Sequence, residues 1–349
     1  MLLDPHTWLL AQSSDEVIEE LSDELSEHIS PETHASVIGL TTDVHADVDE
    51  VVAELAFLRR RLAREVGAMG LTVAAAGTHP LTVREESEIS GAARYRALND
   101  SMRVLARREP TMALHVQVDV PAPEDAVRLL NGLRRSSPVL LALSANSPFW
   151  QGRDSGFASA RTVIFQAFPR TGLPQFFAGY ADYVEELDAL IASGALPDPS
   201  FLWWDVRLQP ALGTVEVRVM DAQSRVRDVA SLVALIQSLA RLELEGDASP
   251  VVPSAAVLAE NRFLAARDGM DARPIDQSAR CLVPVRELLN RLLAECRPHA
   301  LALGCAGALD QVQRLAAANG ADRQRVLVAH GRRLDELVAS LADRFLAPD

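Results

Sequence analysis

The strongest constraint on the fold is an alternating stretch at residues 111–120. Apolar side chains hold every second position from Met112 to Val120, and the positions between them include His115, Gln117 and Asp119. Successive side chains of a strand point to opposite faces, so this stretch predicts a strand with one apolar and one polar face. Antiparallel sheets commonly leave one face open, whereas parallel strands are usually apolar on both faces. The pattern therefore favours an antiparallel sheet.

Two further strands are predicted at residues 201–208 and 214–221, with the turn sequence Gln-Pro-Ala-Leu-Gly between them. This spacing indicates an antiparallel hairpin. The residues predicted to share a face are Trp203, Asp205 and Arg207 in the first strand and Thr214, Glu216, Arg218 and Met220 in the second.

If the three strands are neighbours, carboxylates, an imidazole and two guanidiniums meet on one surface. Carboxylates suit Mg²⁺ and arginines suit phosphate, so such a surface fits metal-assisted phosphoryl chemistry. The alternative is that these residues form the solvated outer face of a one-sided sheet. Periodicity alone leaves both interpretations open.

The rest of the chain reads as helices before the sheet, short strands in the middle and a helical tail. Helices are predicted at residues 14–28, 48–69, 91–107, 121–137 and 139–144, and strands at 34–42 and 71–76. After Ser224 the pattern is entirely helical, around residues 227–245, 283–303 and 323–345. This order predicts an α+β class and not alternating βαβ units. We expect one domain over 1–349, with a mixed α/β core at 1–222 and a helical part at 223–349.

The basic residues of the chain exclude several mechanisms. The sequence contains no lysine, so all of its basic residues other than histidine are arginines. A Walker A loop and a Schiff base both need a lysine amine, which arginine cannot replace. The net charge of -14 would repel a phosphate backbone, so nucleic acid is not an expected partner.

Compartment and cysteine use give weaker constraints. No apolar run reaches the roughly 20 residues of a membrane span, and the first residues have no signal-peptide pattern. We therefore expect a cytoplasmic protein without membrane contact. Cys281, Cys296 and Cys305 lack a CxxC spacing, so they are interpreted as structural thiols and not as a disulfide framework or a zinc site.

Several short strings occur in the order found in one known family. They are AAAGTHP at 74–80, RY at 94–95, HVQV at 115–118, LALSANSPFWQGRDSG at 141–156 with Ser159 and Arg161, WWDVR at 203–207, GTVEVRVMD at 213–221 and ARDG at 266–269. In these strings the chain resembles the bacterial carboxylate-amine ligases, the second type of glutamate-cysteine ligase. The resemblance extends from residue 1 into the helical tail.

The resemblance implies a core like that of glutamine synthetase and the guanido kinases, in which an antiparallel sheet forms a funnel for ATP and divalent metals. It also implies a two-step reaction: ATP phosphorylates a carboxylate, typically of glutamate, and an amine such as that of cysteine then displaces phosphate. The implied catalytic residues are His115, Arg207, Glu216 and Arg218. The implied metal ligands are Glu216, His115 and Asp119. The implied substrate-binding residues are His79, Tyr95, Asn146, Arg153, Ser155 and Arg161. For each of these residues the alternative is a buried, hydrogen-bonded structural role.

The chain also departs from the family at three places that serve the metals. The family's first strand, of the type Gly-Val-Glu-Glu-Glu-Phe, has no counterpart before Met1-Leu2-Leu3-Asp4-Pro5. Gly39 stands where the family has a glutamate, and Gln117 stands where it has a histidine. Asp119 could compensate from the same face of its strand. Fewer ligands should weaken binding of Mg²⁺, which demands near-ideal coordination.

Three hypotheses follow from these observations. The first is a working ATP-dependent ligase that joins a small carboxylic acid to an amine. The second is a degenerate homologue that pairs with a complete ligase subunit or binds a small ligand. The third is an ATP-independent amide-processing enzyme that reuses the substrate pocket. A homo- or hetero-oligomer is expected, with assembly through the helical tail; ordinary core packing explains the amphipathic faces of that tail equally well.

Overall fold

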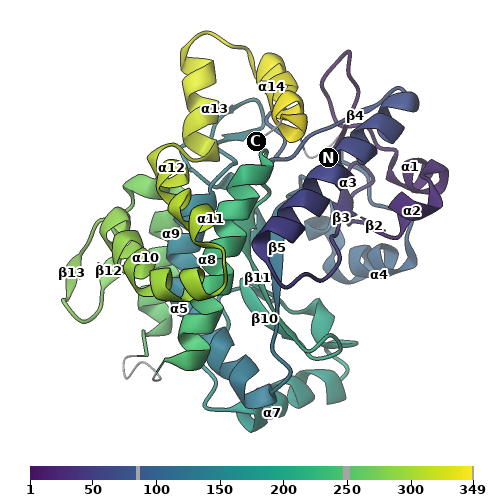
Figure 1. The fold of residues 1–349 in the computed structure, drawn as a ribbon. Coiled ribbons are helices and arrows are strands. Elements are labelled where there is room, and N and C mark those ends of the chain that lie inside the picture. Colours follow the sequence, from purple (N-terminus) through teal and green to yellow (C-terminus); the bar gives the residue numbers. More distant parts are fainter. Residues whose placement is uncertain (84–86, 247–251, 348–349) are drawn as a thin grey trace.

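A three-stranded antiparallel sheet lies at the centre of the fold. The computed structural model describes residues 1–83, 87–246 and 252–347. Strands β5 (Ala113–Asp119), β10 (Val206–Gln209) and β11 (Thr214–Asp221) form the sheet in the order β10-β11-β5 (Figure 1). Both pairings are antiparallel. The predicted hairpin and the predicted adjacency of the three strands are therefore confirmed.

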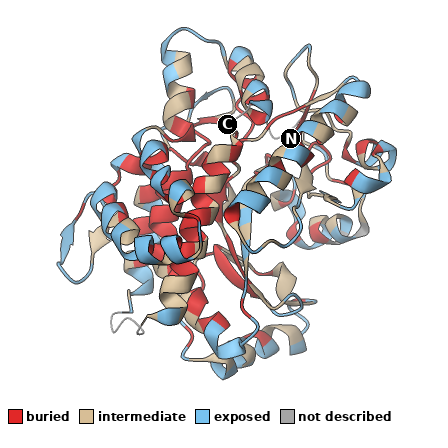
Figure 2. Ribbon diagram, in the orientation of Figure 1, coloured by how far each residue is buried: buried red, intermediate tan, exposed pale blue. Residues whose placement is uncertain are grey.

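Two long helices cover the apolar face of this sheet. They are α5 (Pro123–Ser144) and α8 (Val226–Glu245), and both pack on sheet strands and on each other. Val215 and Val217 of β11 have no exposed surface. Figure 2 shows the buried residues concentrated in these two helices and the strands behind them.

Helix α5 joins two stretches for which separate helices were predicted. Pro138 lies inside the helix, where its missing N–H removes one backbone hydrogen bond. The neighbouring Ser137 donates its hydroxyl to the carbonyl of Leu133, at 2.9 Å. Since nearly every residue from Ala126 onward is buried, packing outweighs the local cost of the proline.

The N-terminal part is built from short elements around one long helix. Helix α3 (Val48–Ala68) matches the prediction closely, and its N-cap Asp47 accepts a hydrogen bond from the N–H of Glu50. The other elements are β1 (Leu2–Leu3), α1 (Ser14–Glu20), α2 (Asp23–Ser26), β2 (Ile29–Pro31), β3 (Ile38–Leu40), β4 (Thr72–Val73), α4 (Ala93–Met102) and η2 (Arg103–Leu105). The strand predicted at 34–42 is thus only three residues long, and it pairs with β2.

The segment between α5 and the hairpin is largely irregular. Its elements are β6 (Phe149–Trp150), β7 (Arg153–Asp154), α6 (Ala160–Phe165), β8 (Thr171–Gly172), α7 (Tyr180–Ala192), η3 (Pro199–Phe201) and β9 (Trp203–Trp204). Strands β8 and β9 pair in parallel, whereas the other pairs of strands in the described chain are antiparallel.

The C-terminal part is helical, with two departures from the prediction. Its elements after α8 are α9 (Ala255–Asp268), η4 (Gly269–Asp271), β12 (Ile275–Asp276), β13 (Cys281–Leu282), α10 (Val285–Ala302), α11 (Ala306–Asp310), α12 (Val312–Ala317), α13 (Gly320–Ala329) and α14 (Leu334–Leu346). The β12–β13 ribbon interrupts a segment predicted to be all helix. The single helix predicted at 323–345 is broken at Gly331, whose φ of 89° is incompatible with a continuing right-handed helix.

No helix in the described part of the chain is both long and apolar enough to cross a membrane.

Candidate active site

The polar faces of the three central strands meet in one row of side chains. Arg207 of β10 is paired with Glu216 of β11, and Glu216 is paired with Gln117 of β5. Residues directly opposite each other in a sheet share a face, so a guanidinium, a carboxylate and an amide lie side by side. The predicted convergence of these faces is confirmed.

Glu216 is the centre of this row. Its Oε2 accepts from Arg207 Nε at 2.5 Å and from Gln209 Nε2 at 2.9 Å. Its Oε1 accepts from Arg218 Nη1 at 2.9 Å and lies 3.3 Å from His115 Nδ1. Only 4% of the Glu216 side chain is exposed. The carboxylate is thus buried, and both of its oxygens are engaged by cationic groups.

The charge state of this cluster follows from these contacts. Burial alone would raise the pKa of Glu216, but Arg218, His115 and Arg207 outweigh it and lower the pKa to about 2. Burial, followed by the field of Arg218, lowers the pKa of His115 well below its usual value, even though Glu216 opposes the shift. Glu216 is therefore an anion and His115 a neutral imidazole at neutral pH. The His115 side chain is 35% exposed, so it faces the open side of the cluster.

A β-bulge in β11 decides which residues face this cluster. Val217 pairs with Val116 and Met220 pairs with Leu114, so Arg218 and Val219 together stand opposite His115. Beyond the bulge the faces are exchanged. Met220 was predicted to share the polar face, but it lies fully buried in the main hydrophobic core.

Asp205 also differs from its prediction. It precedes β10, and its carboxylate binds Arg262 of α9 through Nε at 2.5 Å and Nη2 at 3.1 Å. Its N–H donates to the carbonyl of Gly172. No contact joins Asp205 to Glu216 in the described part of the chain, so this carboxylate anchors a helix beside the site.

Glu32 belongs to the site, although it was not predicted there. It follows β2, and burial raises its pKa even though Arg218, the N-terminal ammonium and Arg94 oppose the shift. Among the described residues, no side chain or backbone N–H donates a hydrogen bond to its carboxylate. A Cβ at Gly39 of β3 would lie 3.1 Å from Glu32 Oε1. Glu32 therefore supplies a carboxylate beside the position where Gly39 lacks one.

The sequence contains little indication that Glu32 lies near the central sheet. Residues 34–42 were predicted to be a strand, and Glu32 stands outside that range. In the structure, β2 ends at Pro31 and β3 begins at Ile38, and Glu32 lies on the connection between these two strands. Tyr95 of α4 fixes the connection by donating its hydroxyl to the carbonyl of Pro31 at 3.0 Å.

The other proposed metal residues are less central. Gln117 accepts a hydrogen bond from the Thr214 hydroxyl at 3.1 Å. Asp119 pairs with Thr214 at the end of β5 and is exposed. It is four residues from His115, which corresponds to about 13 Å along a strand. The structure therefore groups His115 with Glu216 and leaves Asp119 apart.

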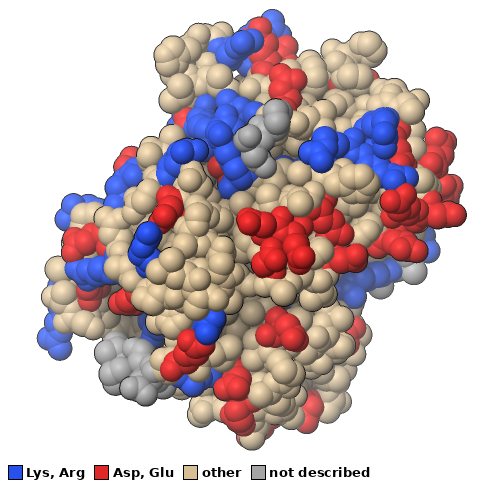
Figure 3. Space-filling view, viewed as in Figure 1, with Lys and Arg blue, Asp and Glu red and all other residues tan. Residues whose placement is uncertain are grey.

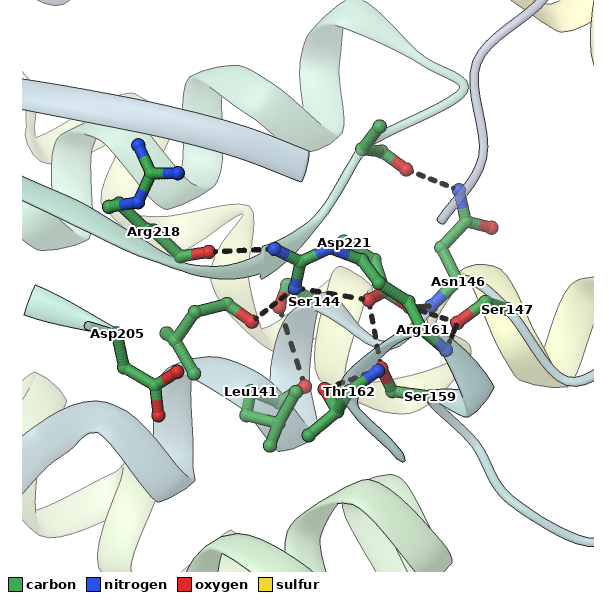
Figure 4. A network of polar contacts seen from close by, with 12 residues as sticks. Leu141, Ser144, Asn146, Ser147, Ser159, Arg161, Thr162, Asp205, Arg218 and Asp221 are labelled. Atoms are coloured by element: carbon green, nitrogen blue, oxygen red, sulfur yellow. Dashed lines mark hydrogen bonds and ion pairs between the residues drawn. The ribbon is translucent and has the colours of Figure 1, made fainter. Parts of the chain in front are cut away.

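Two of the predicted substrate residues, Asn146 and Arg161, lie in or beside a buried network around Asp221 (Figure 4). Asp221 accepts from Asn146 N at 2.8 Å, from Ser147 Oγ at 2.6 Å and from Ser159 Oγ at 2.8 Å. Arg161 donates to the carbonyls of Arg218 and Val219, both at 3.1 Å. These bonds attach the loop to the end of β11, behind the Glu216 row.

The remaining predicted substrate residues have varied environments. Ser155 Oγ donates to the carbonyl of Pro148 at 2.8 Å. Arg153 is exposed on β7. His79 is 2% exposed, and its Nε2 donates to the carbonyl of Trp8 while its Nδ1 accepts from Thr82. Burial lowers the pKa of His79 to about 4, so it is a neutral, internally bonded imidazole. Their roles in substrate binding stay predictions.

Sequence comparison finds relatives over nearly the whole chain. The model of glutamate-cysteine ligase family 2 matches residues 1–343. A protein from Rubrobacter xylanophilus, provisionally named glutamate-cysteine ligase 2-1, is 38% identical over 347 residues, covering 98% of this chain and 92% of the relative. A provisionally named glutamate-cysteine ligase 2 from Thermobifida fusca is 36% identical, covering 99% and 89%.

Structure comparison finds the same fold at low identity. The crystal structure of a glutamate-cysteine ligase from Francisella tularensis in complex with AMP matches with a TM-score of 0.73 and 11% identity, covering 100% of this chain and 88% of that one. A bifunctional glutathione synthetase from Pasteurella multocida matches with a TM-score of 0.64 and 14% identity, covering 97% and 49%. The predicted fold class is therefore confirmed.

Proposed function

Because this chain belongs to glutamate-cysteine ligase family 2, we propose that it is an ATP-dependent carboxylate-amine ligase whose centre is the Glu216 cluster. The reaction moves the γ-phosphoryl group of ATP to a carboxylate, releasing ADP and forming an acyl phosphate. An amine then attacks the acyl carbon, phosphate leaves, and the amine loses a proton. The observation that carries the proposal is the anionic Glu216 held between Arg207, Arg218 and neutral His115.

The cluster provides fixed charges in a largely buried setting. Arg207 also donates to the carbonyls of Ser200 and Leu202, both at 2.8 Å, so its position is set by the backbone. Arg218 is held by Glu216, and burial followed by the field of Arg207 lowers its pKa to about 10, which still leaves it charged at neutral pH. Preorganised charges of this kind stabilise developing negative charge without having to reorient during the reaction.

His115 is the group suited to proton transfer. It is neutral at neutral pH, partly exposed and next to an anion. A neutral imidazole can accept the proton that the amine loses as it attacks the acyl carbon. We therefore assign His115 the role of general base or of a metal ligand, as the two are chemically alternative uses of the same lone pair.

The residues present fit a divalent metal in part. Glu32 has a carboxylate with no hydrogen-bond donor in the described chain, and Glu216 and His115 lie on the neighbouring sheet. Hard carboxylate oxygens suit Mg²⁺, which would offset the charge of the phosphates when bound. We propose Glu32, Glu216 and His115 as its ligands. Gly39 and Gln117 offer no replacement for the family's glutamate and histidine, so we expect weaker metal binding than in a complete family member.

The nucleotide and the compartment follow from the same proposal. The Francisella relative of this fold was crystallised with AMP, and a ligase that forms an acyl phosphate needs ATP. The substrates would be a small acid of the glutamate type and an amine. We expect the reaction to occur in the cytoplasm, where ATP is available.

Gly39 and Gln117 favour one second candidate function. A chain with a weakened metal site could serve as the partner of a complete ligase subunit, in a hetero-oligomer, and contribute binding without turnover. The two proposals differ in whether the purified chain alone consumes ATP.

The test combines binding and turnover. Calorimetric titration with a non-hydrolysable ATP analogue, at millimolar Mg²⁺ and then Mn²⁺, measures nucleotide binding. Phosphate release and mass spectrometry of products, with a panel of acids and amines, measure ligation. We expect acid-dependent phosphate release and an amide product. A well-folded chain that neither binds nucleotide nor forms product would refute the ligase proposal.

Variants identify the site. Glu216→Gln and His115→Asn should each lower kcat/KM at least about a hundredfold, as removal of one preorganised polar group does elsewhere. The matched control is Glu245→Gln, because Glu245 is half exposed at the end of α8 and contacts Arg241 and His299, neither of which belongs to the cluster. Equal activity of Glu216→Gln and the control would place the chemistry elsewhere.

A further inference from the structure

A second group of potential metal ligands lies at the outer end of the β2–β3 ribbon. His28 directly precedes β2, Asp43 follows β3, and Glu54 is in the second turn of α3. Glu32 follows β2 at its other end, four residues from His28, which corresponds to about 13 Å of strand. This group is therefore separate from the Glu216 cluster.

The three side chains converge on one point. One ring nitrogen of His28 and one carboxylate oxygen each from Asp43 and Glu54 all lie within 4.8 Å of one another. Ligands bound to a tetrahedral metal at about 2.1 Å lie about 3.4 Å apart.

The imidazole is already oriented for binding. His28 Nδ1 lies 3.0 Å from the carbonyl of Thr41. A carbonyl only accepts, so Nδ1 carries the proton and the lone pair is on Nε2. A backbone carbonyl that receives the other ring N–H is the usual support of a metal-bound histidine.

Glu54 is supported in the same way. Its Oε2 accepts from His45 Nε2 at 2.7 Å and from the N–H of Asp43 at 2.9 Å. In the described chain, no hydrogen bond uses Glu54 Oε1, the Asp43 carboxylate or His28 Nε2. Each of the three side chains therefore keeps at least one atom with a lone pair available to a metal, while other atoms of His28 and Glu54 hold the side chains in place.

The surrounding charge favours a cation. Asp47, Asp49 and Glu50 lie in the same stretch of chain as Asp43 and Glu54. Figure 3 shows acidic side chains gathered over the beginning of α3, with few basic ones among them. Such a surface attracts cations and not phosphates.

We propose that His28, Asp43 and Glu54 form a binding site for a divalent transition metal of the zinc class, with water completing the coordination. An imidazole together with carboxylates selects such metals over Mg²⁺ and Ca²⁺, which prefer oxygen ligands alone. A bound ion would join α3 to both strands of the β2–β3 ribbon at its outer end. It would thereby fix the ribbon whose far end carries Glu32.

The test is calorimetric titration of metal-depleted protein with Zn²⁺, without nucleotide, in a Cys281→Ser background because Cys281 is an exposed thiol. Co²⁺ is used in parallel, since its visible spectrum reports tetrahedral coordination. We expect one tight site. His28→Gln and Glu54→Gln should each weaken it at least about tenfold and remove the tetrahedral Co²⁺ bands.

Two control variants distinguish this site from Zn²⁺ binding elsewhere on the chain. His330→Gln removes an exposed histidine at the end of α13, and Glu216→Gln disables the proposed active site; both should keep the tight Zn²⁺ site. If the other variants fold poorly, Asp43→Asn changes the third proposed ligand at an exposed position and should likewise weaken Zn²⁺ binding. Wild-type Zn²⁺ affinity in both His28→Gln and Glu54→Gln would overturn the proposal, and so would loss of the site in Glu216→Gln. Because these readouts require no turnover, they are independent of whether the chain is a ligase.

Discussion

The charge of Glu216 should contribute a measurable share of the stability of the fold. The perturbation is Glu216→Gln, which keeps the shape of the side chain and removes its charge. The ordinary pKa of this group is 4.5 and its pKa in the folded chain is about 2. At about 1.4 kcal/mol per pKa unit, the charged form stabilises the folded chain by about 3 kcal/mol at pH 7.

The sign of the pH dependence gives a second measurement. The pKa is lower in the folded chain, so the contribution is fully present above pH 4.5 and is lost as the pH falls toward 2. The same linkage leaves about 1.4 kcal/mol at pH 3. Urea denaturation of both proteins at pH 7 and pH 3 should therefore show a deficit for Glu216→Gln that shrinks by about half.

An exposed ion pair provides the control for this measurement. Glu245→Gln, which removes the charge that faces Arg241 and His299, should change stability by less than about 1 kcal/mol at either pH. If Glu216→Gln is within about 0.5 kcal/mol of the wild type at pH 7, which is on the order of measurement error, the ion cluster does not stabilise the fold as argued. A deficit that is equal at both pH values would mean that packing, and not charge, causes the loss.

Three further changes test other parts of the structure. His79→Gln should remove a pH dependence: the pKa of His79 is about 4 against an ordinary 6.5, so its contribution is lost as the pH falls from 6.5 to 4. The wild type should lose up to about 3 kcal/mol more than the variant over that range in urea denaturation. Leu133→Ala empties a fully buried site on α5 and should cost about 3–5 kcal/mol; a loss below about 1 kcal/mol would contradict its place in the core. Gly39→Glu should lower the melting temperature without metal, because its carboxylate joins Glu32 and its Cβ crowds Ser30 Oγ at 2.5 Å, and millimolar Mn²⁺ should reverse most of the loss. No recovery with Mn²⁺ would mean that Glu32 is not at a metal site.

The sequence carried enough information for the sheet and its polar row. The alternation in 111–120 and the turn before Gly213 predicted the right strands, and His115, Arg207, Glu216 and Arg218 do come together. This part succeeded because a strand has a fixed period of two, so facing residues can be counted along the chain.

Other features depend on contacts between distant segments, which a single sequence does not display. The run around Arg218 fits either face pattern until its pairing with β5 is known, so the bulge was missed and Met220 was assigned to the wrong face. The sequence does not distinguish an asparagine that binds a substrate from one, such as Asn146, that binds the buried Asp221. Glu32 was missed because β2 was not predicted, so the connection between β2 and β3 that carries Glu32 was not recognised.

The bulge in β11 changes which side of the sheet the even-numbered residues of the strand face. Before the bulge, Glu216 and Arg218 face the polar cluster. After the bulge, Met220 faces the hydrophobic core and Asp221 binds the loop that contains Asn146. Point substitutions in this strand change one side chain at a time. Loss of a single residue at 218 or 219 would remove the bulge and leave Met220 opposite Leu114 and Asp221 opposite Ala113. One residue inserted beyond the bulge would instead exchange the anchor with the core, so this strand should tolerate a deletion at the bulge far better than an insertion after it.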